Sequence, residues 1–189
     1  MSLLIVALAY ILCHGMTTFA VTPVQAQILP ETTVFASLVY LPHGVRVLAT
    51  WVYGWKAIPA LIAGAIVSDL IFTPTEIRDY LQPALVESIL IGALSAWAAF
   101  ELLRLAGRDL YAGGRSRLNW TALVLVGAIA SVLNSIGQTI VYSGLIGLEE
   151  ILGVLLTYAV GDLMGLVVCM VVLMFVFRWM RLLGRDGAS

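Results

Sequence analysis

The stretch ILGVLLTYAVGDLMGLVVCMVVLMFVFR, residues 151–178, decides the fold class of this protein. From Ile151 to Phe177 it contains a single charged residue, Asp162. A helix needs about twenty consecutive, mostly apolar residues to cross the hydrocarbon core of a bilayer. This run exceeds that length, so it predicts a transmembrane helix.

The rest of the chain has the same character. Of its 189 residues, 61% are apolar and 11% are charged, and the mean hydropathy is +1.03. An ordinary soluble domain is about half apolar and about a quarter charged. The composition therefore predicts an all-α integral membrane protein, formed by one transmembrane domain over residues 1–189. The formal net charge of −1 shows no basic footprint, so the lipid bilayer is expected as a partner and nucleic acid is not.

Six apolar runs are long enough to be candidate spans. They cover approximately residues 2–22, 33–54, 57–73, 83–104, 119–143 and 151–178. The first run resembles a secretory signal peptide in position, but no Lys or Arg precedes Glu31, so the charged leader of such a peptide is missing. We therefore expect the first run to be a retained helix and the bundle to have six spans.

The distribution of charge predicts the orientation. Cations gather after the second, fourth and sixth runs, at Lys56, at Arg104, Arg108, Arg115 and Arg117, and at Arg178, Arg181 and Arg185. The alternate connections hold Glu31, then Glu76, Arg78 and Asp79, then Glu149 and Glu150. Because Lys and Arg are enriched on the cytoplasmic side, both termini are expected in the cytoplasm. The predicted location is the inner membrane of a prokaryotic cell, as a multi-pass protein.

Polar residues in the second run share one helical face. Tyr40, His43, Arg46 and Thr50 recur at intervals of three and four. Pro42 lies among them and interrupts helical hydrogen bonding. One interpretation is a kinked or broken helix that lines a polar cavity. The other is a structural kink at which Arg46 pairs with a nearby carboxylate.

Two carboxylates lie deep in the apolar runs. Asp69 and Arg46 are at comparable depth when counted from the turn near Gly54, so an ion pair between them is a feasible outcome. Asp162 competes for the same guanidinium. With one deep Arg and two deep Asp residues, one carboxylate is expected to be protonated or to pair with a ligand.

Small residues accompany both carboxylates. Ala60, Gly64 and Ser68 form a stripe beside Asp69, and Gly161 and Gly165 flank Asp162. Stripes of this kind let neighbouring segments approach closely. The fifth run adds a polar stripe, for which interhelical hydrogen bonds are expected: Ser131, Asn134, Ser135 and Gln138. The predicted polar core, and candidate ligand site, consists of Tyr40, His43, Arg46, Asp69, Asn134, Gln138 and Asp162.

Motifs of catalysis are absent from the sequence. It contains no P-loop, no dinucleotide fingerprint, no HExxH and no CxxC. Asp69 and Asp162 imitate the paired carboxylates of an intramembrane aspartyl protease, but the Gly-x-Gly-Asp signature is broken because residue 159 is Ala. Cys13 and Cys169 lack a metal-ligand spacing. We therefore predict a protein without enzymatic activity, cofactor or metal site.

Four short motifs resemble one known family. They are LPHGVR at 41–46, WKAIP at 55–59, AGA at 63–65 and GDLMG at 161–165. This set resembles the first-type membrane-associated sensor domain of bacterial signalling proteins, which implies a sensory role. The family usually has more helices and carries a cytoplasmic kinase, cyclase or phosphodiesterase domain. The resemblance therefore implies a free-standing relative that acts through a partner protein.

Size and helix number are also similar to those of the substrate-binding subunit of an energy-coupling-factor vitamin transporter. That resemblance implies a solute site near the outer face and docking to other membrane proteins. The sequence thus predicts a membrane protein that binds a small, anionic ligand in a polar core and associates with other membrane proteins. A structural accessory subunit is the alternative. A cavity of about 300 Å³ or more would favour binding, whereas full neutralisation of Arg46 by Asp69 or Asp162 would favour a structural role.

Overall fold

The structure is a computed structural model that describes residues 2–28, 30–33, 36–82, 84–113, 120–144 and 151–186. Within these ranges it consists of helices and contains no strand. Five helical segments are apolar and long enough to cross a membrane: Ser2–Gln25, Leu41–Phe72, Ala84–Leu105, Trp120–Val141 and Ile151–Arg181. The predicted all-α class is confirmed for the described residues, and these five segments have the length and composition that an integral membrane protein requires. The predicted count of six spans is not confirmed, because the second and third runs fall together in Leu41–Phe72.

The N-terminal segment is a continuous rod with one irregular turn. Helix α1 (Ser2–Met16) passes into a π-helical turn (Thr17–Val21) and then into α2 (Thr22–Gln25). Pro23 has no N–H to donate, so a regular helix cannot continue through this position. The backbone widens instead, and the N–H of Thr22 bonds to the carbonyl of Thr17, five residues earlier.

The second predicted run does not form a helix over its whole length. After the short α3 (Pro30–Thr33), residues 36–40 are not helical, and α4 (Leu41–Tyr53) begins immediately before Pro42. Of the two expected forms, a kink at Pro42 is not observed, whereas the run is broken before Leu41. Proline is favoured in the first turn of a helix because its missing N–H would have no intrahelical partner there.

The non-helical segment 36–40 is held by groups far away in the sequence. The Gln25 side chain accepts a bond from the N–H of Leu38 (2.6 Å) and donates one to the carbonyl of Ala36 (2.7 Å). The N–H of Tyr40 donates to the carbonyl of Gly161 on α9 (Ile151–Asp186), at 2.9 Å. Buried backbone outside regular helices requires such partners in a membrane protein. The segment is thereby fixed between α2 and α9.

Glycines of α9 create the space for this segment. A side chain at Gly161 would collide with the carbonyl of Ser37, and one at Gly165 with the carbonyl of Tyr40. The predicted close-contact face around Asp162 is confirmed, and its partner is the chain that leads into α4.

A tight turn reverses the chain after α4. Gly54 adopts φ +58°, a conformation that favours glycine, and it opens a 3-10 turn (Gly54–Ala57) before α5 (Ile58–Phe72). Ser2, at the start of α1, shares an apolar groove with Tyr53 at the end of α4. Gly15, near the end of α1, approaches Phe72 at the end of α5. Helices α4 and α5 therefore run in opposite directions along α1.

The stripe on α5 packs as predicted. Gly64 lies against Ala7 and Tyr10 of α1, where a Cβ atom would come within 3.0 Å of both residues. Ala60 and Ser68 are also buried. The prediction of a close helix approach along this stripe is confirmed.

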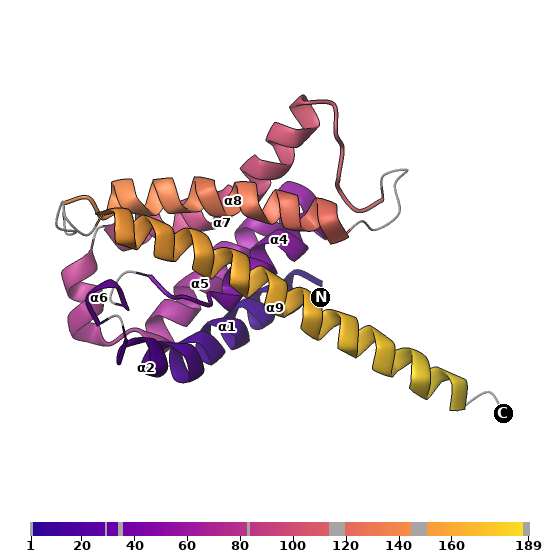
Figure 1. Cartoon of the computed structure of the whole chain (residues 1–189), viewed down its shortest axis with the longest axis horizontal. Helices are drawn as coiled ribbons and strands as arrows, with labels where there is room; N and C mark the ends of the chain where they lie inside the picture. The colour runs from indigo at the N-terminus through magenta and orange to yellow at the C-terminus, as the bar shows by residue number, and fades with distance from the viewer. Residues whose placement is uncertain are drawn as a thin grey trace.

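The remaining helices complete the bundle. They are α6 (Thr75–Leu81), α7 (Ala84–Leu105), α8 (Trp120–Val141) and α9. Helix α8 packs against α7 and α9, and α9 also packs against α4. Figure 1 shows α8 beside α9, and the C-terminal part of α9 projecting beyond the other helices. An apolar core between α4, α7, α8 and α9 contains Val47, Phe100, Val126 and Leu166.

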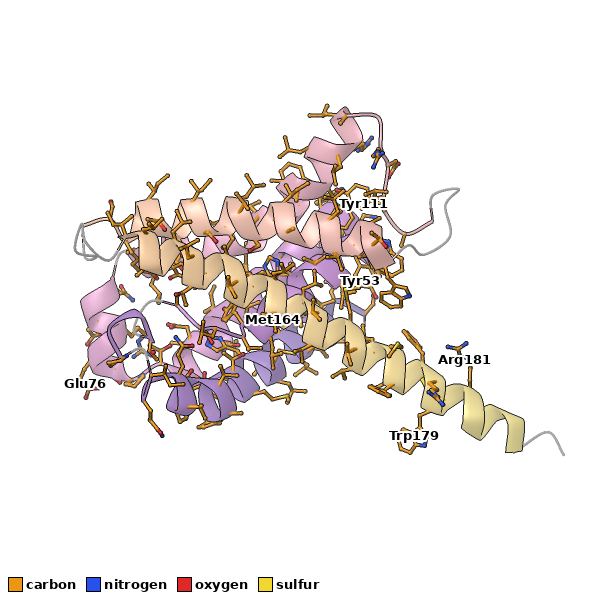
Figure 2. All side chains as sticks on the ribbon, in the orientation of Figure 1. Tyr53, Glu76, Tyr111, Met164, Trp179 and Arg181 are labelled. Atoms are coloured by element: carbon orange, nitrogen blue, oxygen red, sulfur yellow. The ribbon has the colours of Figure 1, made fainter. Side chains whose placement is uncertain are left out.

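The two ends of the bundle carry different residues. Figure 2 shows Glu76 of α6 at one end, Tyr53 and Tyr111 toward the other, and Trp179 and Arg181 on the projecting part of α9. The end that contains α6 is therefore opposite to the end from which α9 projects. We name them the α6 end and the α9 end.

Candidate functional site: a polar cavity around Arg46

A cavity of about 220 Å³ lies toward the α6 end. It is bounded by the π-helical turn, the segment before α4, the end of α5, the start of α7, the end of α8 and the start of α9. We call it the polar cavity, because hydroxyl groups dominate its wall: Thr17, Thr18, Thr22, Thr73, Tyr142 and Tyr158 are among them. The irregular turn at Pro23 helps to bring three of these threonines to one place, which agrees with the frequent occurrence of π-turns at functional sites.

Arg46 is the cation of this wall, and its side chain is 4% exposed. Its Nη2 donates to the hydroxyl of Tyr10 (2.8 Å). The guanidinium carbon lies 5.6 Å from the ring centre of Tyr10 and 5.2 Å from that of Tyr40. These are cation–π distances, so two neutral rings supply part of the stabilisation that water would provide.

No acid of the described residues forms an ion pair with Arg46. Among the described residues no carboxylate oxygen lies within 4.0 Å of the Arg46 nitrogens. The buried Nη1 has no hydrogen-bond partner. The ion pair of Arg46 with Asp69, or with Asp162, is therefore not formed. The physical reason is direction: the guanidinium extends toward Tyr10 on α1 and Gly92 on α7.

Gly92 makes room for the guanidinium. A Cβ atom at this position would collide with the end of the Arg46 side chain. Glycine within a helix lowers helix stability and often has a packing reason. Here the reason is that the Arg46 side chain extends from α4 to the surface of α7.

Tyr10 and Tyr40 form a short chain of hydroxyls next to Arg46. Their oxygens are 3.1 Å apart, and either hydroxyl is able to donate. Since the Tyr10 oxygen already accepts from Arg46, its own hydrogen is available for Tyr40. In that arrangement the hydrogen of Tyr40 remains free to donate to a group in the cavity, which Tyr40 lines.

Asp69 is the carboxylate of the same wall. It belongs to the last turn of α5, where its backbone carbonyl accepts the N–H of Thr73 at 3.0 Å. Its side chain is 9% exposed, and it forms no hydrogen bond or ion pair with the described residues. The polar cavity thus contains a cation and an anion that do not neutralise each other directly.

Gln138 adds an unused acceptor. Its Nε2 donates to the carbonyl of Ser88 (3.0 Å) and to Oδ1 of Asn134 (3.2 Å). Both hydrogens are then engaged, which sets the orientation of the amide. Its Oε1 is buried and has no partner.

A second polar group adjoins the cavity, and we call it the Asp162 network: His43 and Asp162, which lie behind the wall, and Asn134, which also lines the cavity. Asp162 Oδ2 accepts from Asn134 Nδ2 at 2.6 Å and is 3.3 Å from His43 Nδ1. His43 and Asp162 are 0% and 1% exposed, and neither lines the cavity. Here an acid and an imidazole lie at ion-pair distance within the protein, although Nδ1 of His43 and Oδ1 of Asp162 form no hydrogen bond with the described residues.

The geometry of His43 requires a shared proton. Its Nε2 is 3.3 Å from the carbonyl oxygen of Gly127, and a carbonyl only accepts, so Nε2 carries a hydrogen. Nδ1 then faces Asp162 Oδ2, and two bare acceptors at that distance would repel. One proton must therefore lie on either the imidazole or the carboxyl, which leaves the pair without net charge.

The predicted core residues separate into these two groups. Tyr40, Arg46, Asp69, Asn134 and Gln138 line the cavity, while His43 and Asp162 lie behind it. The interhelical bonds expected of the α8 stripe are confirmed for Asn134 and Gln138, as above, and for Ser131, whose Oγ donates to the carbonyl of Ala159 (2.6 Å). Whether any of these residues binds a ligand stays a prediction.

Sequence reasoning missed several contributors: Tyr10, Thr17, Gln25 and Gly92. Tyr10, His14 and Thr17 recur at helical spacing in the first run, and this signal would have indicated a polar face on α1. Gln25 lies beyond the predicted end of that run, and nothing local indicates that it binds the backbone of residues 36–38. Gly92 looks like an ordinary small residue until the position of Arg46 is known.

The α9 end contains an exposed polar contact. Arg104 and Glu101 lie 3.3 Å apart, and the hydroxyl of Tyr111 donates to Glu101 at 2.8 Å. Partial burial, and then the Glu101 carboxylate, raise the pKa of the Tyr111 hydroxyl above its ordinary value. Tyr111 lies toward the end opposite to Glu76 (Figure 2), whereas the residues of the polar cavity lie toward the α6 end.

Within the described ranges no three His, Cys, Asp or Glu side chains group as metal ligands would. Comparison of the chain with family models, with curated proteins and with solved structures gives no match. The resemblance to the sensor-domain family therefore stays a prediction.

Proposed function

We propose that this protein binds a small solute with an anionic group in the polar cavity and that Arg46 anchors that group. In this proposal the chain is a multi-pass protein of a prokaryotic inner membrane and acts as a sensor or as the substrate-binding subunit of a transporter. It crosses the membrane six times, with α4 and α5 as separate crossings and both termini in the cytoplasm. The proposal includes no catalytic step.

The observation that carries the proposal is that Arg46 is buried and has no ion-pair partner among the described residues. Burying a charge without a counter-ion costs several kcal/mol, and ionisable residues inside membrane proteins tend to mark binding sites. Tyr10 and Tyr40 offset part of that cost, but Nη1 stays without a partner. An anionic group in the cavity would supply the missing interaction.

The size of the cavity restricts the solute. Its volume of about 220 Å³ is below the roughly 300 Å³ at which pockets for drug-sized ligands begin. A water molecule occupies about 30 Å³ in the liquid, so the space corresponds to about seven waters. We therefore propose a metabolite-sized solute and not a vitamin-sized one.

The reversal of the chain at Gly54 supports the proposed topology. Since α4 and α5 run in opposite directions along α1, each is able to cross most of the bilayer on its own side of the turn. The α9 end then carries Lys56, Arg104 and Arg181, as the positive-inside rule requires of the cytoplasmic side. The polar cavity lies toward the opposite end, so solute would enter from outside the cytoplasm.

A second candidate function, that of an accessory subunit, is favoured by the projecting part of α9. The 36 residues of this helix would extend about 54 Å, against a hydrocarbon core of about 30 Å. Phe175, Trp179 and Met180 on this part are more than half exposed. An apolar helix that leaves its own bundle is a suitable element for contact with another membrane protein.

Mass spectrometry of small molecules that co-purify with the protein distinguishes the two functions. The native protein, Arg46→Gln and the control Arg78→Gln, which alters a cation of α6 outside the cavity, are purified in mild detergent. We expect a small anionic molecule from the native protein and from Arg78→Gln, and none from Arg46→Gln. If protein partners co-purify equally with all three and no small molecule is found, the accessory function is correct and solute binding is wrong.

A further inference from the structure

We infer that the solute is a small zwitterion, with a carboxylate and an ammonium group, as in an amino acid. The inference rests on the proposed function and adds a second recognition group to it. It derives from the presence of both charges in the wall of one cavity, each without an ion-pair partner among the residues that the structure describes.

The carboxylate end of such a solute matches Arg46 and Tyr40. The guanidinium is a planar fork of donors suited to a carboxylate, and one of its nitrogens has no partner. The Tyr40 hydroxyl can donate to the same group once it accepts from Tyr10. Two adjacent donors, one of them charged, form the strong type of carboxylate site.

The ammonium end matches Asp69 and Gln138. Asp69 has no hydrogen-bond or ion-pair partner among the described residues, and the Oε1 of Gln138 is an acceptor left over from its own network. An ammonium group carries three donors and no acceptor. These two oxygens offer it one charged and one neutral partner.

The charges also select against solutes that carry only one sign. A simple anion held by Arg46 would share a cavity of about 220 Å³ with the Asp69 carboxylate, and a simple cation would share it with Arg46. Like charges repel more strongly where water is scarce. Arg46 and Asp69 do not form an ion pair, because their charged atoms are more than 4.0 Å apart, so a molecule that binds to both has no ion pair between them to break.

Matched probes test this inference. L-alanine, propionate and ethylamine have similar size, and the last two each lack one charged group of the first. Their binding to the full-length protein in nanodiscs is measured by equilibrium dialysis with labelled probes. We expect L-alanine to bind at least tenfold more tightly than propionate, and ethylamine not to bind. β-Alanine and 4-aminobutyrate extend the series, because they carry the same two groups at larger separations.

Two conservative variants separate the role of Asp69 from a general effect of charge. Asp69→Asn should weaken L-alanine binding by about ten- to a hundredfold, the value of a hydrogen bond to a charged group. It should not weaken the binding of propionate, which loses a repulsive neighbour. The control Glu87→Gln changes an exposed carboxylate in the first turn of α7 and should retain the native preference for L-alanine.

The outcomes separate failure of this inference from failure of the proposed function. If propionate binds as tightly as the zwitterions and Asp69→Asn changes neither, the zwitterion inference is wrong and the anion site stands. The zwitterion inference is also wrong, and the anion site stands, if no zwitterion of the series binds while the purified protein holds a simple anion. If ethylamine binds better than propionate, or Arg46→Gln leaves every affinity unchanged, both are wrong.

Discussion

The polar cavity and the Asp162 network are neighbours that treat buried charge in opposite ways. In the Asp162 network the acid has His43 and Asn134 on one oxygen, and the shared proton removes the net charge. In the polar cavity Arg46 and Asp69 keep their charges apart, and hydroxyl groups surround them. The comparison teaches that a buried ionisable residue indicates a ligand only where the protein itself leaves the charge uncompensated.

The difference arises because the two residues lie three positions apart on one helix. His43 and Arg46 both lie on α4, but a step of three residues turns the side chain by about 60° around the axis. His43 meets α8 and α9, which supply a carbonyl and a carboxylate. Arg46 meets α1 and α7, which supply a phenol and the space above a glycine.

The largest expected effect comes from breaking the Asp162 network. Asp162→Ala removes one partner of a buried pair, so we expect it to lower the free energy of unfolding by about 3–5 kcal/mol. The measurement is reversible unfolding in detergent, followed by circular dichroism. Arg46→Gln is the matched variant in the polar cavity, and it should change stability by less than about 1 kcal/mol or increase it, because it removes an uncompensated charge. Equal losses in the two variants would mean that the cavity is also a structural network.

A smaller loss of stability is expected where the segment before α4 crosses α9. Gly161→Ala places a methyl group against the carbonyl of Ser37, and backbone cannot yield as a flexible side chain does. Overpacking of this kind costs about 1–3 kcal/mol. Gly153→Ala, in the same helix with no heavy atom of a neighbour within 4 Å, is the control and should be neutral or slightly stabilising. If both variants unfold alike, segment 36–40 is not packed as described.

The variant Gly92→Ala tests the position of the Arg46 guanidinium without removing its charge. Gly92→Ala forces the end of the Arg46 side chain to move. We expect solute affinity to fall by about tenfold, equivalent to about 1.4 kcal/mol, with little loss of helix content. Equilibrium dialysis with the probe that binds the native protein best provides the measurement. An unchanged affinity would show that the position of the guanidinium does not determine binding.

The exposed contact at the α9 end shows how small the loss of stability is when a hydrogen bond is partly solvated. Tyr111→Phe removes the hydrogen bond to Glu101 and retains the stacking on Phe100, whose ring centre is 4.8 Å away. We expect a loss of about 0.5–1 kcal/mol, as for a partly solvated hydrogen bond. A spectroscopic titration adds a check on sign: Glu101→Gln should lower the raised pKa of Tyr111, so tyrosinate absorbance should appear at lower pH than in the native protein. No change would mean that Glu101 does not act on this hydroxyl.

The last prediction concerns the position of a single proton between His43 and Asp162 and involves no loss of stability. Infrared difference spectra of the native protein and Asp162→Asn should show either the carbonyl stretch of a protonated carboxyl group or a carboxylate beside a protonated imidazole. Each spectrum corresponds to one position of the shared proton. A carboxylate beside a neutral His43 would contradict the geometry at Gly127 and Asp162.

Much of the framework follows from the sequence because it depends on local patterns. Hydropathy located the five segments that are long and apolar enough to cross a membrane, although it divided Leu41–Phe72 into two runs. A segment that crosses lipid must satisfy its backbone internally, which favours such long apolar helices. Periodicity located the stripe on α8, because residues three or four apart share a helix face. It also located the glycine face on α9. For the same reason Tyr40, Arg46, Asp69, Asn134 and Gln138 could be named as a polar core.

What periodicity cannot determine is the partner of each face. The start of α4 at Leu41 depends on Gln25 and Gly161, which bind the backbone of the preceding segment from far away in the chain. The pairing of Asp162 with His43, and not with Arg46, depends on how α4 is rotated against α9. An ionisable group takes the compensation that its neighbours offer, and those neighbours are chosen by the packing of whole helices. The sequence therefore determined which charges are buried, and only the tertiary structure decided which of them remain available to a ligand.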